Sequence, residues 1–385
     1  MLSIEIACWV GRYDPGDPVE SRETAWEARL SSVRSVGRQG QGSPGRVVTM
    51  RDIAKAAGVS QSTVSRVLSG TSSAVSIGPE ARERVLAVAD RMGYRPNPLA
   101  RGLRGASTML LGVIVREIMD PFFAAAVEAI TYESRARGYN LVLGQAHGRA
   151  DEAIALRSVL ETRHVDAMLI LGDMRDQPRL IDDLRASSVP AVALWQGTAL
   201  PGIATVNVDN AAGIRAALDL VTEFGHERIG LIVGRPLGDI QARRAAYLDY
   251  MTERGAVRDS YLVTVANDPA GGVSAMEALL RLEEPPTAVL ATTDVLAIGA
   301  LHAAHLVSLR VPRDVSVVGF DDIPLAAFTV PALTTVRMPI AEMAAIAVRI
   351  AIDEGGGIAP DAQPPVHVVA PTLVSRESVG PPRGE

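Results

Sequence analysis

Residues 48–68 read VTMRDIAKAAGVSQSTVSRVL, and this stretch carries the signals for two short helices joined by a tight turn. Thr49 is a natural N-cap, Gly58 can adopt the left-handed conformation that ends a helix, and Ser60 can cap the next one. The apolar positions that share one face of each predicted helix are Ile53, Ala54, Ala57, Val64, Val67 and Leu68. Such a pair predicts a helix-turn-helix, whose second helix enters the major groove of DNA.

A third helix is expected after the loop at residues 70–77. Pro79 suits its first turn, and either Ser76 or Gly78 can cap it. The apolar stripe that should face the first two helices is Val85, Leu86, Val88, Ala89 and Met92. Tyr94 to Pro98 then breaks regular structure, because the residue before each proline is pushed toward extended backbone.

These residues resemble the LacI/GalR family of bacterial regulators. The matching motifs are Asp52-Ile53-Ala54, Ala57-Gly58-Val59-Ser60, Thr63-Val64-Ser65-Arg66-Val67-Leu68, Gly93-Tyr94-Arg95-Pro96-Asn97 and Ala100-Arg101-Gly102-Leu103-Arg104. The resemblance covers roughly Val47 to Val379, and its motifs are specific because they occur together and in register. It implies an all-α helix-turn-helix headpiece plus an α/β, periplasmic-binding-protein-like core of two doubly wound parallel-sheet subdomains.

Charge is distributed unevenly along the chain. Between Arg46 and Gly105 there are ten Arg or Lys and four Asp or Glu, so this segment carries +6. The whole chain carries −6, and the remainder therefore carries −12. A basic head on an acidic body confines the attraction for phosphate to one part of the molecule.

Five segments are predicted along the chain. Residues 1–46 mix Pro, Gly, Ser and both charges, and we expect a disordered extension there. Lys55 is the only lysine, a bias typical of GC-rich coding in which start codons are easily misassigned. Our hypothesis is that translation begins near Val47, Val48 or Met50. The headpiece, hinge, two-lobed core and disordered tail are expected at 47–94, 95–106, 107–377 and 378–385.

From Ser107 onward, apolar strand-like runs alternate with amphipathic helical patterns, which is typical of parallel, doubly wound sheets. The strands are expected at 110–115, 140–143, 167–171, 191–194, 205–208, 229–233, 262–265, 288–291 and 315–319. Helices expected between them include 121–137, 151–162, 210–224, 243–253 and 295–306. So many strands predict two α/β lobes. The resemblance implies crossings between the lobes near Val206, near Arg337 and near the end.

The DNA contacts are expected mainly from the second helix. Gln61, Ser62 and Arg66 are the candidates for base contact, because Gln and Arg carry forked donors that read A or G. The resemblance places these three at the specificity positions of the family. The hydroxyl side chains expected to contact phosphates or cap helices are Thr49, Ser60, Thr63 and Ser65.

A hinge is expected between the headpiece and the core. The resemblance implies that Leu103 wedges into the minor groove together with its dimer mate, although packing on the core is the alternative. Arg101 and Arg104 can hold the neighbouring phosphates, and Asn97 is included among the DNA-binding residues. Gly102 weakens any helix here by about 1 kcal/mol relative to Ala.

Effector-binding residues are expected where strands of the core end, because a doubly wound sheet places its ligand crevice there. By the resemblance, Arg243 and Asp321 bind the effector, with Arg243 preferred to Arg244 for its spacing to Tyr247. The other predicted ligand residues are Asp120, Phe122, Phe123, Trp195 and Thr293. A carboxylate, a guanidinium and aromatic rings suit a polyhydroxylated ligand, but each ring could equally be core.

The identity of the effector stays open between two classes. A sugar or sugar derivative is the first hypothesis, and a nucleoside, purine or other small metabolite is the alternative. Pro269 stands where many sugar-responsive members carry an aromatic side chain, and Thr293 replaces a common asparagine. Both departures weaken the prediction of a plain hexose.

We therefore expect a cytoplasmic transcriptional regulator, most simply a repressor, that binds a pseudo-palindromic double-stranded operator as a homodimer. The lone Cys8 fits a reducing compartment, and no apolar run is long enough to span a membrane. A transport-type solute-binding protein is the remoter alternative. An enzyme is not expected, because no nucleophile elbow, P-loop or dinucleotide fingerprint occurs. No cofactor or metal site is predicted, and His226 is assigned to a turn.

Overall fold

The computed structural model describes most of the chain from residue 48 to residue 383. The described ranges are 48–69, 77–94, 107–146, 165–174, 176–187, 189–197, 199–200, 202–235, 238–353 and 364–383. The chain divides into two compact units, one ending at Pro96 and one beginning at Asn97. The predicted hinge at 95–106, the predicted extension at 1–46 and the predicted helix at 151–162 lie outside the described residues.

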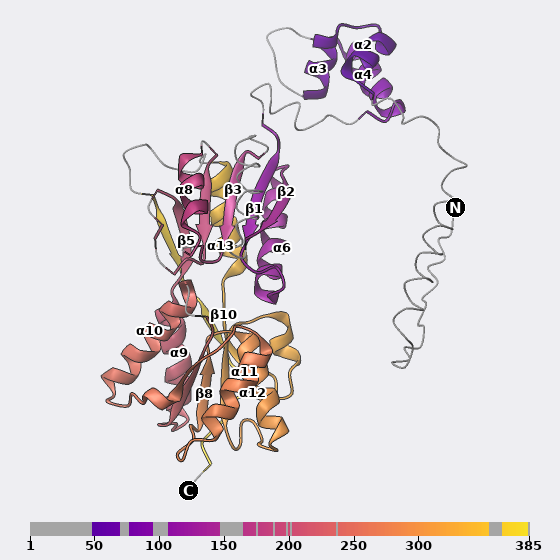
Figure 1. Ribbon diagram of the computed structural model, residues 1–385. Coiled ribbons are helices and arrows are strands. Elements are labelled where there is room, and N and C mark those ends of the chain that lie inside the picture. The colour runs from indigo at the N-terminus through magenta and orange to yellow at the C-terminus, as the bar shows by residue number, and fades with distance from the viewer. Residues whose placement is uncertain are drawn as a thin grey trace, which may run out of the picture. The chain divides into compact units, whose positions relative to one another are not determined.

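The headpiece consists of three helices: α2 (Met50–Ala57), α3 (Gln61–Ser69) and α4 (Pro79–Arg91) (Figure 1). A capping box begins α2, because the Asp52 N–H donates to Thr49 Oγ1 at 3.3 Å and the Thr49 N–H donates to Asp52 Oδ2 at 2.9 Å. Gly58 follows with φ +65°, which ends α2 in the left-handed conformation. The predicted start, turn and end of the first helix are confirmed.

A small apolar core holds the three helices together. Ile53, Val64 and Val85, one from each helix, are completely buried. Leu86, predicted to belong to this core, is 46% exposed and the prediction was wrong. Val85, Val88 and Ala89 already fill the face of α4 that meets α2 and α3, and Leu86 lies about 100° around the helix from Val85.

The first lobe of the core contains a six-stranded parallel sheet with the order β11-β5-β4-β3-β1-β2. Its strands are β1 (Leu110–Val115), β2 (Asn140–Gln145), β3 (Ala167–Leu171), β4 (Ala191–Leu194), β5 (Ala204–Val208) and β11 (Val366–Val369). Helices α6 (Pro121–Ala136) and α13 (Ile340–Ile352) pack together against one face, and α8 (Pro178–Ala186) packs against the other. Successive residues of β1 therefore enter different apolar clusters, Val113 on one face and Ile114 on the other.

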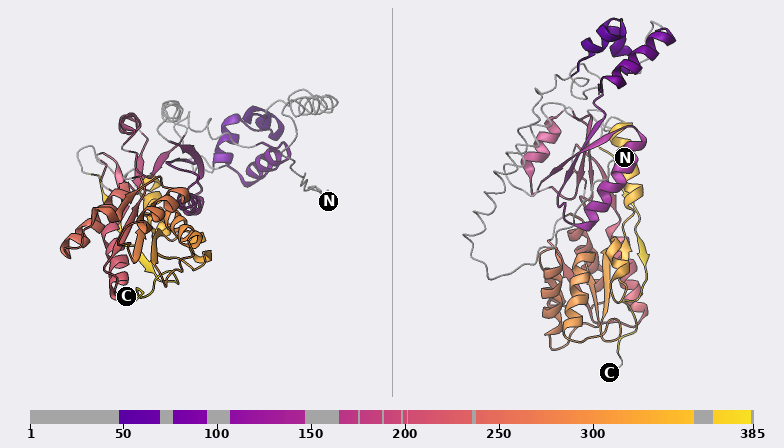
Figure 2. Two further views of the ribbon diagram at one scale, coloured as in Figure 1. Left: turned by 60° about the horizontal axis from the view of Figure 1, so that its bottom comes forward. Right: turned by 90° about the vertical axis from the view of Figure 1, so that its right-hand side faces the viewer.

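The second lobe contains another six-stranded sheet, with the order β12-β10-β9-β8-β6-β7. Its strands are β6 (Ile229–Val233), β7 (Leu262–Thr264), β8 (Ala288–Ala291), β9 (Ser316–Asp321), β10 (Thr334–Arg337) and the antiparallel β12 (Thr372–Val374). Its helices are α9 (Asn210–Glu223), α10 (Gly238–Glu253), α11 (Pro269–Leu280) and α12 (Asp294–Leu306). One pair, α9 and α10, covers one face, and α11 and α12 cover the other (Figures 1 and 2).

Three crossings join the lobes, and all three were expected. The chain leaves the first lobe after β5, returns after β10 through α13, and passes from β11 to β12 with two residues between them. All nine predicted strands are present, with ends that differ by at most two residues. The short strands β10, β11 and β12 were not predicted individually. Among the described residues, no helix combines the length and the apolar character needed to span a membrane.

The end of the chain packs on the second lobe, so the prediction of a disordered tail from 378 was wrong as far as residue 383. Ser378 is fully buried, and its hydroxyl donates to Val317 O at 2.6 Å and accepts the Thr334 N–H at 2.8 Å. The Gly380 carbonyl lies 2.8 Å from His226 Nε2. Backbone and side-chain hydrogen bonds therefore fix a segment whose polar composition alone suggested disorder.

Candidate functional site

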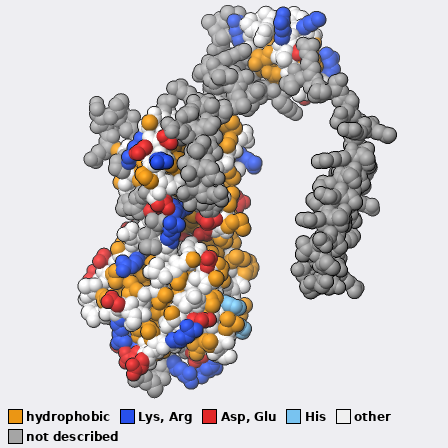
Figure 3. Space-filling model, in the orientation of Figure 1, with side chains coloured by type: hydrophobic (Ala, Val, Ile, Leu, Met, Phe, Trp, Pro, Cys, Tyr) orange, Lys and Arg blue, Asp and Glu red, His pale blue; other side chains and the backbone are white. Residues whose placement is uncertain are grey.

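Helix α3 presents a polar face that fits contact with base edges. Gln61 and Ser62 are exposed, and Arg66 is half-buried, on the side opposite the buried Val64 and Val67. On the face of the headpiece visible in Figure 3, several Lys and Arg side chains reach the surface. The structure therefore brings the three predicted base-reading residues to one short helix in a cationic unit.

Hydroxyl groups gather at the start of α3. Ser60 Oγ accepts the Thr63 N–H at 3.1 Å, and it lies 2.7 Å from Ser62 Oγ and 2.8 Å from Thr63 Oγ1. Thr49 takes the corresponding place at the start of α2, and Ser65 is half-buried on α3. Two capped helix starts, each with a positive dipole end and short hydroxyl groups, suit phosphate contact. The predicted hinge contacts Asn97, Arg101, Leu103 and Arg104 lie outside the described residues.

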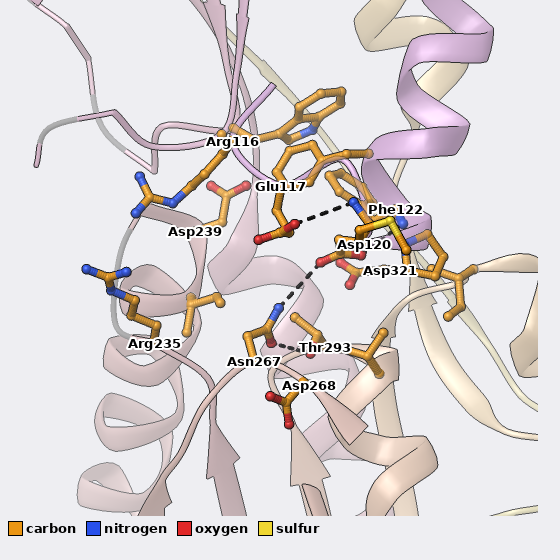
Figure 4. A pocket seen from close by; sticks show the side chains of 18 of the residues that line it. Arg116, Glu117, Asp120, Phe122, Arg235, Asp239, Asn267, Asp268, Thr293 and Asp321 are labelled. Atoms are coloured by element: carbon orange, nitrogen blue, oxygen red, sulfur yellow. Dashed lines mark hydrogen bonds between the residues drawn. The ribbon is translucent and has the colours of Figure 1, made fainter. Parts of the chain in front are cut away.

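A cavity of about 750 Å³ lies between the two lobes of the core (Figure 4). All seven predicted effector residues line it: Asp120, Phe122, Phe123, Trp195, Arg243, Thr293 and Asp321. Trp195 and Asp321 lie at the ends of β4 and β9, Asp120 and Thr293 are the N-caps of α6 and α12, and the others lie in the first two turns of α6 or α10. Its volume falls in the range of small-molecule sites.

Arg243 is the centre of the hydrogen-bond network in the second lobe. Its Nη1 lies 3.1 Å from Asp321 Oδ1 and donates to Thr292 O at 2.6 Å, and its Nε donates to Asn210 Oδ1 at 2.9 Å. The guanidinium stacks on the Phe320 ring, with its carbon 3.7 Å from the ring centroid. Both charged side chains are almost fully buried, so the protein itself satisfies most of the donors of Arg243.

The network continues to a carboxylate that sequence reasoning missed. Asn210 Nδ2 donates to Asp239 Oδ1 at 2.9 Å, whereas Asp239 Oδ2 is buried without a hydrogen-bond partner. Asp239 lies one helical turn before Arg243 on α10, so the two side chains share a face of that helix. The prediction began this helix at Arg243 and thus omitted the turn that carries Asp239; α10 begins at Gly238.

A chain of hydrogen bonds links the two lobes across the cavity. Asp120, in the first lobe, caps α6 by accepting the Phe122 N–H at 3.0 Å. In the second lobe, Asn267 Nδ2 donates to Asp120 Oδ2 at 3.4 Å, and Thr293 Oγ1 donates to Asn267 Oδ1 at 2.7 Å. Figure 4 shows this chain running from Asp120 through Asn267 to Thr293. Thr293 therefore acts on the cavity partly by orienting Asn267.

Two arginines converge on one carboxylate at the edge of the cavity. Arg116 makes a bidentate contact with Asp176, at 2.9 and 2.8 Å, and also donates to the Asp173 carbonyl. Arg235, from the second lobe, lies 3.7 Å from the same carboxylate. Because Asp176 belongs to the first lobe, this ion pair also connects the lobes.

Aromatic side chains form one wall of the cavity. The ring of Phe122 meets Phe123 and Trp195 edge to face, with centroids 5.2 and 5.0 Å apart. Trp195 has φ +59° and its indole N–H points to Met343 Sδ at 3.2 Å. The rings therefore pack against one another and also face the cavity, so packing and ligand contact are compatible here.

Three cavity carboxyls are poorly solvated. Burial is the main cause that raises the pKa of Asp120 and of Asp239, and it raises the pKa of Asp321 well above the ordinary value of a carboxyl. Arg243 opposes the shift at all three residues, and the charge of Asp120 adds to the shift at Asp321. The cavity therefore disfavours the ionised form of these three carboxyls.

Several lining residues were not predicted: Arg116, Glu117, Asp173, Arg235, Asp239, Asn267 and Asp268. The signal that could have found most of them is position, because they follow β1, β3, β6 and β7 and so lie at the carboxyl ends of parallel strands. Pro269, which was singled out as a lost stacking position, is the first residue of α11, with Asp268 as its cap. Arg244 is exposed outside the cavity, and His226 is buried against Thr287, Ser316 and Gly380.

Both units of the chain match models of known protein families. The model for bacterial regulatory proteins of the lacI family matches residues 49–97, and the periplasmic binding protein-like domain matches residues 218–379. The HTH-type transcriptional regulator GalS of Salmonella typhimurium is 35% identical over 337 residues, which cover 86% of this chain and 97% of that protein.

Two solved structures extend the likeness to three dimensions. The lac repressor dimer bound to operator and the anti-inducer ONPF is similar with a TM-score of 0.77 and 25% identity, covering 87% of this chain and 100% of that one. The complex of the transcriptional regulator CelR with cellobiose has a TM-score of 0.63 and 29% identity, covering 86% and 99%.

Proposed function

The chain belongs to the lacI family of bacterial regulatory proteins, and from this premise we propose that it is a repressor controlled by a small molecule bound between its lobes. It is a sequence-specific DNA-binding transcriptional regulator. The observation that carries the proposal is the pairing, in one chain, of a capped helix-turn-helix with a two-lobed core whose cavity contains every predicted effector residue.

The headpiece supplies the DNA contacts. Gln61, Ser62 and Arg66 read bases, and the hydroxyl groups at the two helix starts, with the hinge arginines Arg101 and Arg104, hold phosphates. The chain acts as a homodimer on a pseudo-palindromic operator, since each headpiece reads one half-site. The related lac repressor was solved as a dimer on operator. The regulator works in the cytoplasm.

The core supplies the control. A sugar or sugar derivative is the effector that the cavity suits best, because carboxylates, a guanidinium and aromatic rings line it together. The relative CelR was solved with cellobiose. An effector that binds one arrangement of the lobes better than another shifts the population of DNA-binding dimers. The relatives described above are regulators rather than enzymes, and we assign no catalytic activity to this chain.

The proposal is tested by selecting DNA fragments that the full chain prefers over random competitor. Arg66→Ala should reduce the preference for the selected operator by about 1–3 kcal/mol, because a bidentate base contact is lost. Arg84→Ala is the matched control, because Arg84 is exposed on α4 and its substitution removes the same charge. A chain that selects no operator, or an Arg66→Ala variant that matches Arg84→Ala, would refute the assignment.

A further inference from the structure

The cavity contains more carboxylates than cations. Six carboxylate side chains line it (Glu117, Asp120, Asp173, Asp239, Asp268 and Asp321), against three guanidinium groups. Each guanidinium already contacts a carboxylate: Arg243 contacts Asp321, whereas Arg116 and Arg235 both contact Asp176. The formal charge of the lining is therefore −3, and an anionic effector would meet more repulsion than attraction.

Two of these carboxylates come from opposite lobes and lie close enough to interact. Asp120 is the N-cap of α6 in the first lobe, and Asp321 ends β9 in the second lobe; Figure 4 shows both side chains in the same part of the cavity, and the charge of Asp120 raises the pKa of Asp321. Within the described residues, Asp321 accepts a side-chain hydrogen bond only at Oδ1, from Arg243, and Asp120 Oδ2 accepts one of 3.4 Å from Asn267. Both carboxylates keep acceptor capacity that faces the cavity.

A third carboxylate of the cavity belongs to the hydrogen-bond network of Arg243, which it joins through Asn210. Asp239 is 7% exposed, lines the same cavity and has an Oδ2 atom without a hydrogen-bond partner. A buried carboxylate without a partner destabilises the protein, and two carboxylates close together destabilise it further. Hydroxyl groups of a neutral sugar can donate to these oxygens, but they leave the negative charge in place. A protonated amino group supplies three donors and also cancels charge.

We propose that the effector carries a protonated amino group, which lies between Asp120 and Asp321 and makes the ligand an amine-bearing, polyhydroxylated molecule such as a hexosamine. This inference rests on the proposed function, because it names the chemistry of the same effector. An ammonium in this position bridges the lobes, since one carboxylate belongs to each. The effector therefore favours the arrangement in which the lobes are close together.

The test is a calorimetric titration of the full chain with glucosamine, galactosamine and mannosamine. Each amine is compared with its parent hexose and with its N-acetyl derivative, which keep the hydroxyl groups but lack the charge. At least one amine should bind about tenfold or more tightly than both of its neutral counterparts, since hydrogen bonds to charged groups are the stronger ones. Equal or weaker binding of all three amines overturns the inference.

A variant pair checks where the amine is held. Asp120→Asn keeps an N-cap for α6 but removes the charge, so it should abolish the amine preference, which is the ratio of the affinity for an amine to the affinity for its parent hexose. Asp249→Asn is the matched control, because Asp249 is exposed on α10 outside the cavity. An amine preference that survives Asp120→Asn overturns the inference. A hexose that binds and changes operator affinity would do so too, if no amine outperformed it, while supporting the proposed function.

Discussion

The headpiece and the cavity of the core hold their polar groups in place by different means. At the start of α2 and of α3, each capping group reaches a partner three residues away in the chain. In the core, the partners of Arg243 are 33, 49 and 78 residues away. The headpiece is therefore specified locally, whereas the cavity exists only when two sheets and three crossings have formed.

This difference predicts how each region responds to substitution. The capping groups are exposed, so water can replace the hydrogen bonds that the loss of a cap breaks, and the cost stays near that of one hydrogen bond. In the cavity, each side chain satisfies several others, so removing one leaves buried charges or donors without partners. Four substitutions test this contrast, and they follow in order of expected effect.

Asp321→Ala should have the largest effect on stability. It leaves the buried guanidinium of Arg243 without its carboxylate, which typically costs about 3–5 kcal/mol. The free energy of unfolding of the core in urea measures this loss, with the exposed Asp249→Ala as control. If the two variants unfolded alike, the buried ion pair would not be the structural centre of the second lobe.

Asp294→Asn should change how stability depends on pH. Asp294 accepts the Thr335 hydroxyl at 2.5 Å and the Ile323 N–H at 2.8 Å, and burial raises its pKa from 3.8 to about 6. A raised carboxyl pKa means that the folded state binds a proton more tightly than the unfolded state. This contribution is present below about pH 4 and is lost as the pH rises through about 6.

The shift of about two pKa units corresponds to about 3 kcal/mol. The wild type should therefore lose about 2 kcal/mol more than Asp294→Asn between pH 4 and pH 7, because the unfolded carboxyl is already partly ionised at pH 4 and asparagine does not titrate. Urea unfolding at the two pH values gives the difference directly. The other buried carboxyls are common to both proteins; the charge of Asp294 also raises the pKa of Asp321, so its removal adds to the measured difference in the same direction. An identical pH dependence in both would show that Asp294 is ionised without cost.

Gly238→Ala should disturb the contact between the lobes. A Cβ at Gly238 would lie 2.8 Å from the Asp173 Cβ and 3.3 Å from the carbonyl oxygens of Trp195 and Gln196, all in the first lobe. Gly255→Ala is the matched control, because its φ of +63° resembles the +51° of Gly238 but nothing lies within 4 Å of its added Cβ.

The backbone strain is shared by the two glycine variants, so their difference reports the clash alone, which we expect to be about 1–3 kcal/mol. Gly238→Ala should also weaken effector binding more than Gly255→Ala, because Gly238 directly precedes Asp239, which lines the cavity. Urea unfolding and calorimetric titration measure the two effects. Equal behaviour of both variants would mean that the lobes separate at this point without cost.

Thr49→Ala should have the smallest effect, about 1 kcal/mol, because it removes one capping side chain. Thr49→Ser keeps the hydroxyl group and should unfold like the wild type. The loss should be confined to the headpiece, measured by thermal unfolding, with the transition of the core unchanged. A change in the core transition would contradict the local character of the headpiece.

The sequence predicted much of the fold, and the exceptions share a cause. The capping box at Thr49 and the turn at Gly58 depend on neighbouring residues, so a linear pattern reveals them. Strands β10, β11 and β12 are short and interrupt their apolar residues with polar or charged ones, unlike the wholly apolar β4 and β8, and they form because other strands offer free edges. Residues 378–383 have the composition of a polar tail, but Val317 and Thr334, which are distant in the sequence, provide hydrogen-bond partners for Ser378.

The cavity was predicted in outline, since Arg243, Asp321 and the aromatic residues were recognised from their motifs and do line it. Their partners were not. Asp239 was not predicted because the predicted helix began at Arg243, about one turn after its observed start. Asn267 was not predicted because its contact with Asp120 joins residues 147 positions apart. No pattern within a short window can encode such a pair.

By itself, the amino-acid sequence determined the two helices and turn of the headpiece, the alternation of strands and helices, and the family. These depend on backbone preferences and apolar spacing, which act over a few residues. Only the tertiary structure decided that Asp120 and Asp321 lie close enough to interact and that Asp239 is left without a full set of partners. Those facts follow from desolvation and charge at a contact between two lobes, and such a contact exists only after the chain has folded.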